Sequence, residues 1–202
     1  MKRLFDIIGS VLGALVFSPW LLLIGLCVWW LDGRPILFSQ TRVGWRGRDF
    51  KLLKFRTMTV QRGAEQGRFD LGRSSRVTAL GRRLRQTKLD ELPQLWNVLS
   101  GDMSLVGPRP EVRKWVEVYP EKWGRVLTVR PGITDPASIV YRNEEEVLAA
   151  SPDPEDTYRN VILPRKLDLY EEYVRTRTWW GDIGILLNTL RVVIMPQNAS
   201  NA

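Results

Sequence analysis

The longest pattern in the chain is an almost unbroken apolar run over residues 4–31, interrupted only by Asp6 and a few small residues. As one helix this run would be about 40 Å long, at about 1.5 Å per residue. A bilayer core of about 30 Å needs only about 20 residues. The run therefore predicts a membrane helix, and its apolar region is too long for a signal peptide.

Two features of this run favour a helix that enters and leaves the bilayer by the same face. Ser18-Pro19 falls in its middle, where Pro19 removes a backbone hydrogen bond and the Ser18 hydroxyl can bond back to an earlier carbonyl. Both flanks are basic, with Lys2 and Arg3 before the run, whereas the positive-inside rule asks for one cytoplasmic cationic flank. The arginines after it are Arg34, Arg42, Arg46 and Arg48. We expect a re-entrant helix kinked at Ser18-Pro19, with Lys2 and Arg3 as membrane-surface anchors. A kinked spanning helix is the alternative, and it is the commoner arrangement.

Shorter patterns downstream predict a small sheet and several helices. Residues 38–43 and 50–55 are extended and flank Gly44-Trp45-Arg46-Gly47, which indicates a β-hairpin. Residues 61–75 are polar and rich in glycine, so we expect a loop there. The other expected elements are helices at residues 111–119 and 121–129, a turn at residues 130–136, a loop at residues 149–154, and a helix at residues 163–178 with Leu167, Tyr170 and Val174 inward.

The fold class that follows is α+β and mostly helical, with a re-entrant membrane helix, a small β-hairpin and amphipathic helices in the membrane plane. Residues 179–194 are apolar but too short and too polar to span a bilayer comfortably. We expect them to lie among the headgroups or to pack on the core. The domain organisation we expect is a membrane helix at residues 1–33, a continuous cytoplasmic catalytic domain at residues 34–196, and a disordered tail at residues 197–202.

The densest candidate chemistry lies within residues 85–110. Asp90 and Glu91 are adjacent and precede apolar residues at helical spacing, so we expect them at the start of a short helix. Thr87 or Asp90 would cap this helix, and Pro93 is tolerated in its first turn. At such a position free N–H groups and the helix dipole favour anions.

Arginines accompany this acidic pair. Arg85 precedes it, and Arg109 follows between two prolines, whose fixed φ angles restrict where the guanidinium points. Carboxylates beside cations on a stiff frame indicate a phosphate site, and Arg142 is a further candidate phosphate ligand. For any one of these charges a helix cap or a surface ion pair is the simpler explanation, but the group favours chemistry. The adjacent carboxylates should also titrate apart, leaving one easier to protonate.

Charge balance and two scarce residue types narrow that chemistry. The chain has 30 Lys and Arg against 22 Asp and Glu, a formal net charge of +8, which favours a polyanionic partner. It has no histidine, which excludes a Ser-His-Asp triad, a histidine base and a histidine-ligated metal. Its one cysteine, Cys27, lies in the apolar run, so an internal disulfide and a cysteine zinc site are excluded too. A carboxylate nucleophile attacking phosphorus stays open, as does Mg²⁺ held by one carboxylate and substrate phosphates.

Several short motifs occur together over nearly the whole chain. They are Ser18-Pro19, Lys54-Phe55-Arg56-Thr57-Met58, Leu89-Asp90-Glu91-Leu92-Pro93-Gln94, Gly101-Asp102-Met103-Ser104, Gly107-Pro108-Arg109-Pro110 and Pro131-Gly132-Ile133-Thr134. In this order they resemble the bacterial sugar transferase family, the small monotopic polyprenyl-phosphate phosphoglycosyl transferases. The chain resembles the minimal catalytic unit of that family, without the further domains of some members. It departs from the pattern at Asp135-Pro136, where many members have Gly-Trp, so we carry over no sugar or nucleotide contacts from that segment.

The resemblance implies a reaction and the residues that perform it. A sugar 1-phosphate passes from a nucleotide sugar, usually UDP-linked, to a polyprenyl phosphate such as undecaprenyl phosphate, giving a polyprenyl diphosphosugar and UMP. By resemblance Asp90 is the nucleophile that forms a phosphosugar-enzyme intermediate, and it also contacts Mg²⁺. Glu91 activates or positions a reactant, and Arg85, Arg109 and Arg142 bind substrate phosphates.

The same resemblance implies where the enzyme works. It places the chain at the bacterial inner (cytoplasmic) membrane, on the lipid bilayer, with the catalytic domain on the cytoplasmic face. It implies the first membrane step of a glycoconjugate such as capsule, exopolysaccharide, O-antigen or glycoprotein. No nucleic acid partner is expected, and a homo-oligomer is left open.

Two other functional hypotheses compete with this one. A membrane-anchored basic module that binds anionic lipid or nucleic acid without catalysis explains the charge and the apolar run. It does not explain an acidic pair among arginines or the proline-framed Arg109. An enzyme of this fold that has lost activity is the third hypothesis, and the intact pair of Asp90 and Glu91 argues against it.

Overall fold

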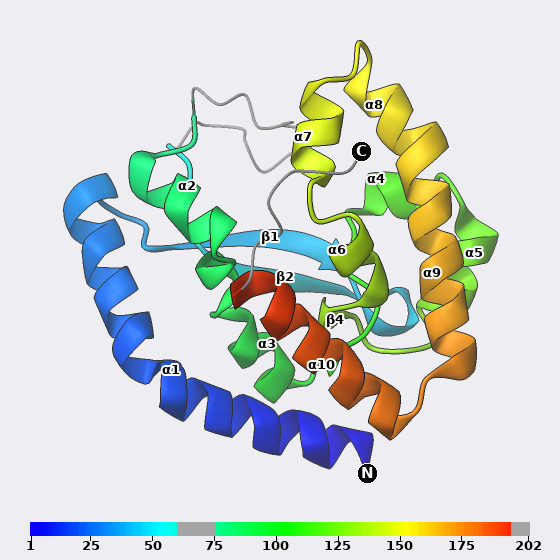
Figure 1. The fold of residues 1–202 in the computed structure, drawn as a ribbon, viewed down its shortest axis with the longest axis horizontal. Helices are drawn as coiled ribbons and strands as arrows, with labels where there is room; N and C mark the ends of the chain where they lie inside the picture. Colours follow the sequence, from blue (N-terminus) through cyan, green and yellow to red (C-terminus); the bar gives the residue numbers. More distant parts are fainter. Residues whose placement is uncertain (60–75, 195–202) are drawn as a thin grey trace.

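One long helix, α1 (Lys2–Asp32), carries the apolar run in the computed structural model, which describes residues 1–59 and 76–194 (Figure 1). By length and composition alone this helix could cross a membrane. Most of its large apolar side chains are exposed, whereas Asp6, Ser10, Ile24 and Val28 are buried against the rest of the protein. The helix therefore turns a narrow face to the protein and a wide apolar face outward.

The middle of α1 bends without breaking. Pro19 lies inside the helix, and the Ser18 hydroxyl donates to the Leu15 carbonyl at 2.8 Å, as expected for a serine that bonds back along its own helix. In Figure 1 α1 runs along the lower edge of the molecule and then turns up its left side. The structure has one curved helix at Ser18-Pro19, and the re-entrant path through a bilayer stays a prediction.

The predicted β-hairpin is confirmed. β1 (Leu37–Val43) and β2 (Asp49–Phe55) pair antiparallel, with Phe38 opposite Lys54. The short 3₁₀ turn η1 (Trp45–Gly47) connects them at the glycine-rich tetrapeptide that the sequence marks as a turn. The hairpin therefore presents one face, including Lys54, toward the helices that follow it.

Short helices and turns make up most of the remaining described chain. In order, the elements are α2 (Ala79–Gln86), η2 (Leu89–Glu91), α3 (Gln94–Ser100), β3 (Ser104–Val106), α4 (Arg113–Val116), α5 (Pro120–Val126), β4 (Gly132–Thr134), α6 (Pro136–Val140), α7 (Glu144–Ala149), α8 (Pro154–Thr157), the π-helical turn η3 (Tyr158–Ile162), α9 (Leu163–Thr176) and α10 (Trp179–Ile194). The loop expected at residues 61–75 and the tail expected at residues 197–202 lie outside the described residues.

Two of the expected helices are shorter or shifted. The helix expected over residues 111–119 is reduced to α4, because the Glu111 carbonyl accepts a hydrogen bond from the Val43 N–H at 2.8 Å and is held extended beside β1. The next helix, α5, begins at Pro120, which suits a first helical position because it has no N–H to lose. Their placement in a membrane plane stays a prediction.

The turn expected over residues 130–136 is wrong in its second half. β3 and β4 pair in parallel there, with Ser104 opposite Gly132 and Val106 opposite Thr134. A Cβ atom on Gly132 would lie 2.1 Å from the Gly107 backbone nitrogen, so glycine is what lets the two backbones approach. Strands of three residues are too short to show an alternating pattern, and each partner is distant in sequence. Because parallel strands end at one edge, the residues after β3 and β4 meet there.

The largest core cluster packs α9 against the helices before it. Leu167 and Tyr170 of α9 are buried as predicted, but the next inward residue is Tyr173, and the predicted Val174 is only half-buried. Trp123 of α5 packs against Tyr170 with ring centroids 6.2 Å apart. The main core thus joins the second half of the chain and includes Val43 at the end of β1.

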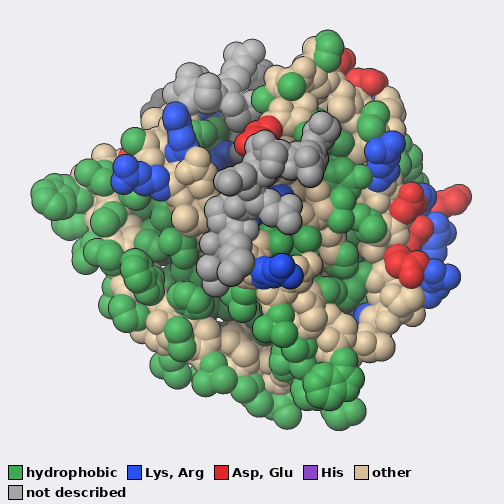
Figure 2. Space-filling view, in the orientation of Figure 1, with side chains coloured by type: hydrophobic (Ala, Val, Ile, Leu, Met, Phe, Trp, Pro, Cys, Tyr) green, Lys and Arg blue, Asp and Glu red, His purple; other side chains and the backbone are tan. Residues whose placement is uncertain are grey.

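The predicted segment at residues 179–194 forms α10, which contacts α6, β3 and β4. Trp179 and Trp180 at its start are exposed. In Figure 2 apolar side chains gather along the lower and left edges of the molecule, over α1 and the start of α10. The helix therefore packs on the core, one of its two expected placements, while its first residues join the apolar surface of α1.

Candidate active site

The acidic pair lies in the 3₁₀ turn η2, between α2 and α3. The capping expected from Thr87 or Asp90 is wrong. Thr87 ends α2, with its hydroxyl donating to the Arg83 carbonyl at 2.9 Å, and the N-cap of α3 is Pro93 without a side-chain bond. Lys88 turns the chain sharply between the two helices, at φ 57° in the left-handed region. Asp90 and Glu91 are thus placed just before α3 by a tight turn, and both are buried.

Glu91 is held by two cations. Arg109 donates to it twice, from Nη2 to Oε1 at 2.5 Å and from Nη1 to Oε2 at 3.2 Å, and Lys54 Nζ donates to Oε1 at 2.9 Å. Such a paired, fork-like contact fixes both position and orientation of a carboxylate. Burial alone would raise the pKa of Glu91, but the charges of Arg109 and Lys54 outweigh it and hold that pKa well below its usual range. Glu91 is therefore a fixed anion.

Asp90 is in a different state. It exposes 5% of its surface, and its Oδ1 atom has no hydrogen-bond partner among the described residues. Burial raises the pKa of Asp90, although the charge of Lys54 pulls it partly back. The predicted split in titration is confirmed in direction, with Asp90 as the group that is easier to protonate. The pair thus consists of one carboxylate that two cations hold in place and one with a buried oxygen that no described residue bonds.

Lys54 belongs to this site, although the sequence pointed to it only as part of a motif. Its ammonium group donates to Glu91. Burial holds the pKa of Lys54 below its usual value, although the Glu91 charge acts in the opposite direction. The available signal was a lysine between Leu53 and Phe55 in an otherwise apolar strand end. Its side chain is 24% exposed, and a lysine partly buried among apolar neighbours is rarely left unpaired.

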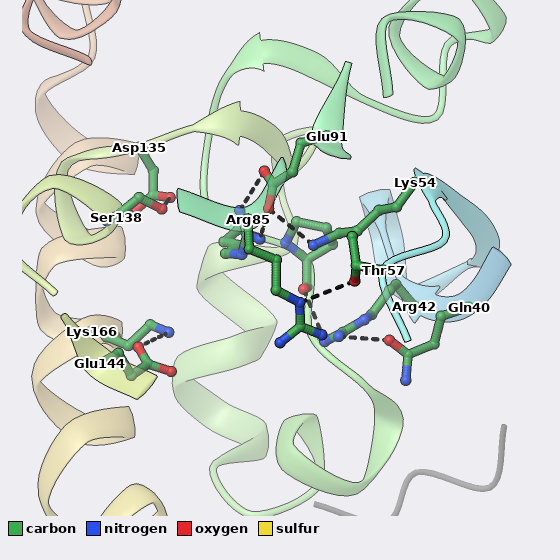
Figure 3. A network of polar contacts seen from close by, with 12 residues as sticks. Gln40, Arg42, Lys54, Thr57, Arg85, Glu91, Asp135, Ser138, Glu144 and Lys166 are labelled. Atoms are coloured by element: carbon green, nitrogen blue, oxygen red, sulfur yellow. Dashed lines mark hydrogen bonds and ion pairs between the residues drawn. The ribbon is translucent and has the colours of Figure 1, made fainter. Parts of the chain in front are cut away.

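Of the three predicted arginines, the structure brings Arg85 and Arg109 to this region. Arg85 projects from the last turn of α2, and its Nε donates to Thr57 Oγ1 at 3.0 Å. Figure 3 shows Arg85, Thr57, Lys54 and Glu91 grouped between the hairpin and the helices. Cations from β2, from α2 and from the segment after β3 therefore lie near Glu91.

Arg142 has a different place. Its Nη1 donates to the Val192 carbonyl at 2.5 Å, in the last turn of α10. This is a helix-end contact of a kind that arginine commonly makes with unpaired carbonyls. The structure therefore places Arg142 on α10 and not in the group around Glu91.

A partly buried carboxylate, Glu111, fixes the hairpin to the helices beside the site. Glu111 accepts from Arg42 Nη1 at 2.6 Å and from the Tyr158 hydroxyl at 2.8 Å. Burial would raise the pKa of Glu111, but the charges of Arg42 and Lys166 hold it below its usual value. Arg42, expected as a cationic flank of the membrane run, thus lies in the polar network of Figure 3.

Asp135, where the sequence departs from the family pattern, caps a helix. Its carboxylate accepts from the Ser138 N–H at 2.9 Å and also from the Ser138 hydroxyl, so it begins α6 just after β4. Asp135 is fully buried, and burial raises its pKa. The residue pair Asp135-Pro136 is thus a helix start, with proline at the first position.

Comparison with known proteins gives one consistent family. A family model described as "Bacterial sugar transferase" matches residues 1–196. The chain is 34% identical, over 96% of its length, to a UDP-N-acetylgalactosamine-undecaprenyl-phosphate N-acetylgalactosaminephosphotransferase of Aeromonas hydrophila, of which it covers 44%. It is 34% identical over 98% of its length to an undecaprenyl-phosphate galactose phosphotransferase of Salmonella typhimurium, of which it covers 41%.

A shorter relative matches over more of its own length. The chain is 36% identical, over 98% of its length, to the UDP-glucose:undecaprenyl-phosphate glucose-1-phosphate transferase of Caulobacter vibrioides, and covers 71% of it. By contrast, the chain spans less than half the length of the Aeromonas and Salmonella relatives.

Proposed function

Because the chain belongs to the bacterial sugar transferase family, we propose that it transfers a sugar 1-phosphate from a UDP-sugar to a polyprenyl phosphate at a membrane. The products would be a polyprenyl diphosphosugar and UMP, the first membrane step of glycoconjugate assembly. The names of the relatives support this reaction, since they are phosphotransferases that act on undecaprenyl phosphate. The observation that carries the proposal is the buried Asp90, one oxygen of which no described residue bonds, beside a Glu91 that two cations hold in place.

Asp90 is the proposed nucleophile. Its carboxylate attacks the phosphorus that bears the sugar, the bond from that phosphorus to the bridging oxygen breaks, and UMP leaves with the electron pair. A phosphate oxygen of the polyprenyl phosphate then attacks the aspartyl phosphosugar, which frees Asp90 and forms the new diphosphate. Glu91 already has both oxygens bonded to Arg109, which makes it the positioning partner and leaves the attack to Asp90.

The cations around the pair suit the charge of this reaction. An anionic nucleophile approaching a diphosphate is repelled unless positive charge lies close by. Lys54 and Arg109 keep part of their surface exposed beside Glu91, and Arg85 lies on Thr57 in the same group. We assign Arg85 and Arg109 to the substrate phosphates. Arg142 would have to leave the Val192 carbonyl to take part.

Mg²⁺ is the proposed cofactor. Among residues 1–59 and 76–194 no group of three or more acidic, histidine or cysteine side chains forms a metal cage. A single carboxylate with a buried oxygen that has no partner in the described part of the chain fits Mg²⁺, which takes most of its ligands from water and substrate phosphates. Asp90 would hold the ion, and the ion would neutralise charge on the diphosphate.

The re-entrant course of α1 is also part of the proposal, and contacts at both ends of the helix support it. At the N-terminal end, Lys2 pairs with Asp182 of α10 at 2.5 Å. At the other end, the Thr78 hydroxyl donates to Asp32 at 2.9 Å, and Arg56 donates to the Gly33 carbonyl at 2.8 Å. A helix tied at both ends to one domain cannot place those ends on opposite faces of a bilayer. We therefore propose that both ends of α1 lie on the same face as the domain. Because the proposed UDP-sugar donor is cytosolic, we propose that this is the cytoplasmic face of the inner membrane.

Cysteine labelling in membrane vesicles checks this topology. In a Cys27→Ser background, one cysteine is inserted before Lys2 and, in a second protein, Arg34 is replaced with Cys. An impermeant thiol reagent should label both proteins from the same face of the vesicles. Labels on opposite faces would establish the kinked spanning helix instead.

A quench experiment tests the reaction. Purified protein in lipid nanodiscs is mixed with Mg²⁺ and a panel of UDP-sugars labelled in the sugar and its phosphate, without polyprenyl phosphate. We expect one sugar to leave label on the denatured protein and to release UMP in equal amount, and added polyprenyl phosphate should then remove the label. If no sugar gives either label or lipid-dependent UMP release, the chain is better described as an anionic-lipid-binding module.

A further inference from the structure

We propose that Asp6, in the membrane helix α1, is a positioning residue for the active site, because it fixes β3 and through β3 the contact of Arg109 with Glu91. The inference rests on the proposed function, since it gives Asp6 a part in that reaction. On this proposal the first turns of α1 help to position the active-site residues and also anchor the protein to the membrane.

Asp6 is a buried acidic residue inside the apolar run of α1. It exposes 2% of its surface, and its carboxylate accepts from the Ser104 hydroxyl at 2.9 Å and from the Leu105 N–H at 3.1 Å. Burying a carboxylate is costly even when it is bonded, and an apolar side chain would satisfy a membrane helix at no such cost. The carboxylate therefore points to a specific task at β3.

That task is to complete the edge of a very short strand. The Ser104 N–H donates to the Pro131 carbonyl at 2.8 Å, on the β4 side. Successive N–H groups of a strand point to opposite sides, and the next one, on Leu105, meets Asp6. Asp6 thus supplies the acceptor that a neighbouring strand would supply on the open edge of β3. A pair of strands alone is marginally stable, so this acceptor matters for the register of β3.

A displacement of β3 would be passed on to Arg109. Only Gly107 and Pro108 separate β3 from Arg109, and neither has freedom to absorb a shift. The Gly107 N–H donates to the Thr134 carbonyl at 3.0 Å, and the proline ring fixes its own φ angle. Because Arg109 holds both oxygens of Glu91, the position of β3 decides where the acidic pair and its cation meet.

Arg3, one turn before Asp6 on α1, holds the other element that leads to the pair. Its Nη1 donates to the Val98 carbonyl at 2.6 Å and its Nη2 to the Leu99 carbonyl at 3.1 Å, in the last turn of α3. α3 has seven residues, and Glu91 lies just before its start. Arg3 and Asp6, on one face of α1, therefore bind α3 and β3. α3 follows Glu91 in the chain, and β3 precedes Arg109, so both partners of the Glu91–Arg109 contact are positioned from α1.

The test compares Asp6→Ala and Asp6→Asn with Leu12→Ala, a substitution at an exposed position of the same helix, in full-length protein reconstituted in nanodiscs. The measurement is kcat, together with KM for the UDP-sugar and for undecaprenyl phosphate. Asp6→Ala should lower kcat roughly 10- to 100-fold, as a small misplacement of reacting groups does, while KM for undecaprenyl phosphate stays within about twofold. Asp6→Asn keeps an oxygen for the Leu105 N–H and should lose less, and Leu12→Ala should match the wild type.

Equal kcat values for Asp6→Ala and Leu12→Ala would overturn the proposal. So would a raised KM for undecaprenyl phosphate with unchanged kcat, because α1 would then act by capturing lipid. If Asp6→Ala is not recovered folded, Asp6→Leu takes its place, since it removes the acceptor of the Leu105 N–H while filling the space of the carboxylate. A lowered kcat then supports the proposal, and an unchanged kcat overturns it. An inactive wild-type protein would instead contradict the proposed function, so the two failures are distinguishable.

Discussion

Replacing Asp90 with Asn should abolish covalent labelling by the UDP-sugar and lower kcat by roughly 10³-fold or more, as loss of a nucleophile does. The amide has nearly the volume of the carboxylate but no charge, and it cannot form the acyl phosphate that the reaction requires. Because Asp90 is buried and its Oδ1 has no described partner, the substitution removes chemistry with little loss of protein contacts. The measurement is label retained after denaturation, alongside lipid-dependent UMP release.

Asp168→Asn is the matched control, since Asp168 pairs with Lys122 at the surface and its side chain is 64% exposed. It should leave turnover within about twofold of the wild type, because exposed ion pairs contribute little. Should Asp90→Asn keep lipid-dependent UMP release near the wild-type rate, the nucleophile assignment would be wrong although the reaction class would stand. Thermal unfolding of both variants establishes that each is folded.

The features that the sequence predicted well are those whose signals are local. The apolar run of α1 and the extended segments on either side of Gly44-Trp45-Arg46-Gly47 each lie within one stretch of chain. The adjacency of Asp90 and Glu91 is likewise a local fact, and the split in their pKa values follows from two carboxylates in unequal surroundings. Local pattern was therefore enough for the main elements and for the acidic pair.

What the sequence could not predict depends on contacts between distant segments. β3 and β4 are three residues each, and only their mutual pairing makes them strands. Lys54 becomes a site residue because β2 lies beside η2, which no periodicity reveals. Arg142 carries the same charge as Arg109, yet its side chain donates to a backbone carbonyl of α10. In each case the residue type was visible, and the partner was set by the fold.

The unexpected placement of Asp6 follows the same logic. As one acidic residue in an apolar run it marked an interruption of the membrane helix. In the fold it faces β3 and is among the best-bonded side chains of α1. A single acidic or basic residue within a membrane helix thus indicates that its side chain has a specific polar partner in the fold.

Replacing Arg109 with Ala should lower kcat by roughly 10²- to 10³-fold, the usual effect of removing one preorganised donor from a site that stabilises developing charge. The substitution removes the two hydrogen bonds that fix Glu91 and the cation assigned to a substrate phosphate. It also leaves Glu91 buried with Lys54 as its remaining described partner, so the free energy of unfolding should fall by about 3 kcal/mol at neutral pH. Arg109→Lys keeps the charge without the fork and should lose less, on the order of tenfold.

The pH dependence of stability separates these two roles of Arg109. The pKa of Glu91 is depressed in the folded protein, so its pairing stabilises the fold above the unfolded pKa, and this contribution is lost as pH falls through the folded pKa. Without Arg109 the pKa of Glu91 rises, and the stability gap between variant and wild type should be largest at neutral pH and shrink in acid. Arg113→Ala is the control, because Arg113 and Asp49 form a half-exposed pair and its loss should cost less than about 1 kcal/mol. Suppose that the difference in unfolding free energy between Arg109→Ala and the wild type shrinks in acid as described, but that Arg109→Ala has the same kcat as Arg113→Ala. Arg109 is then a structural partner of Glu91 and not a phosphate ligand.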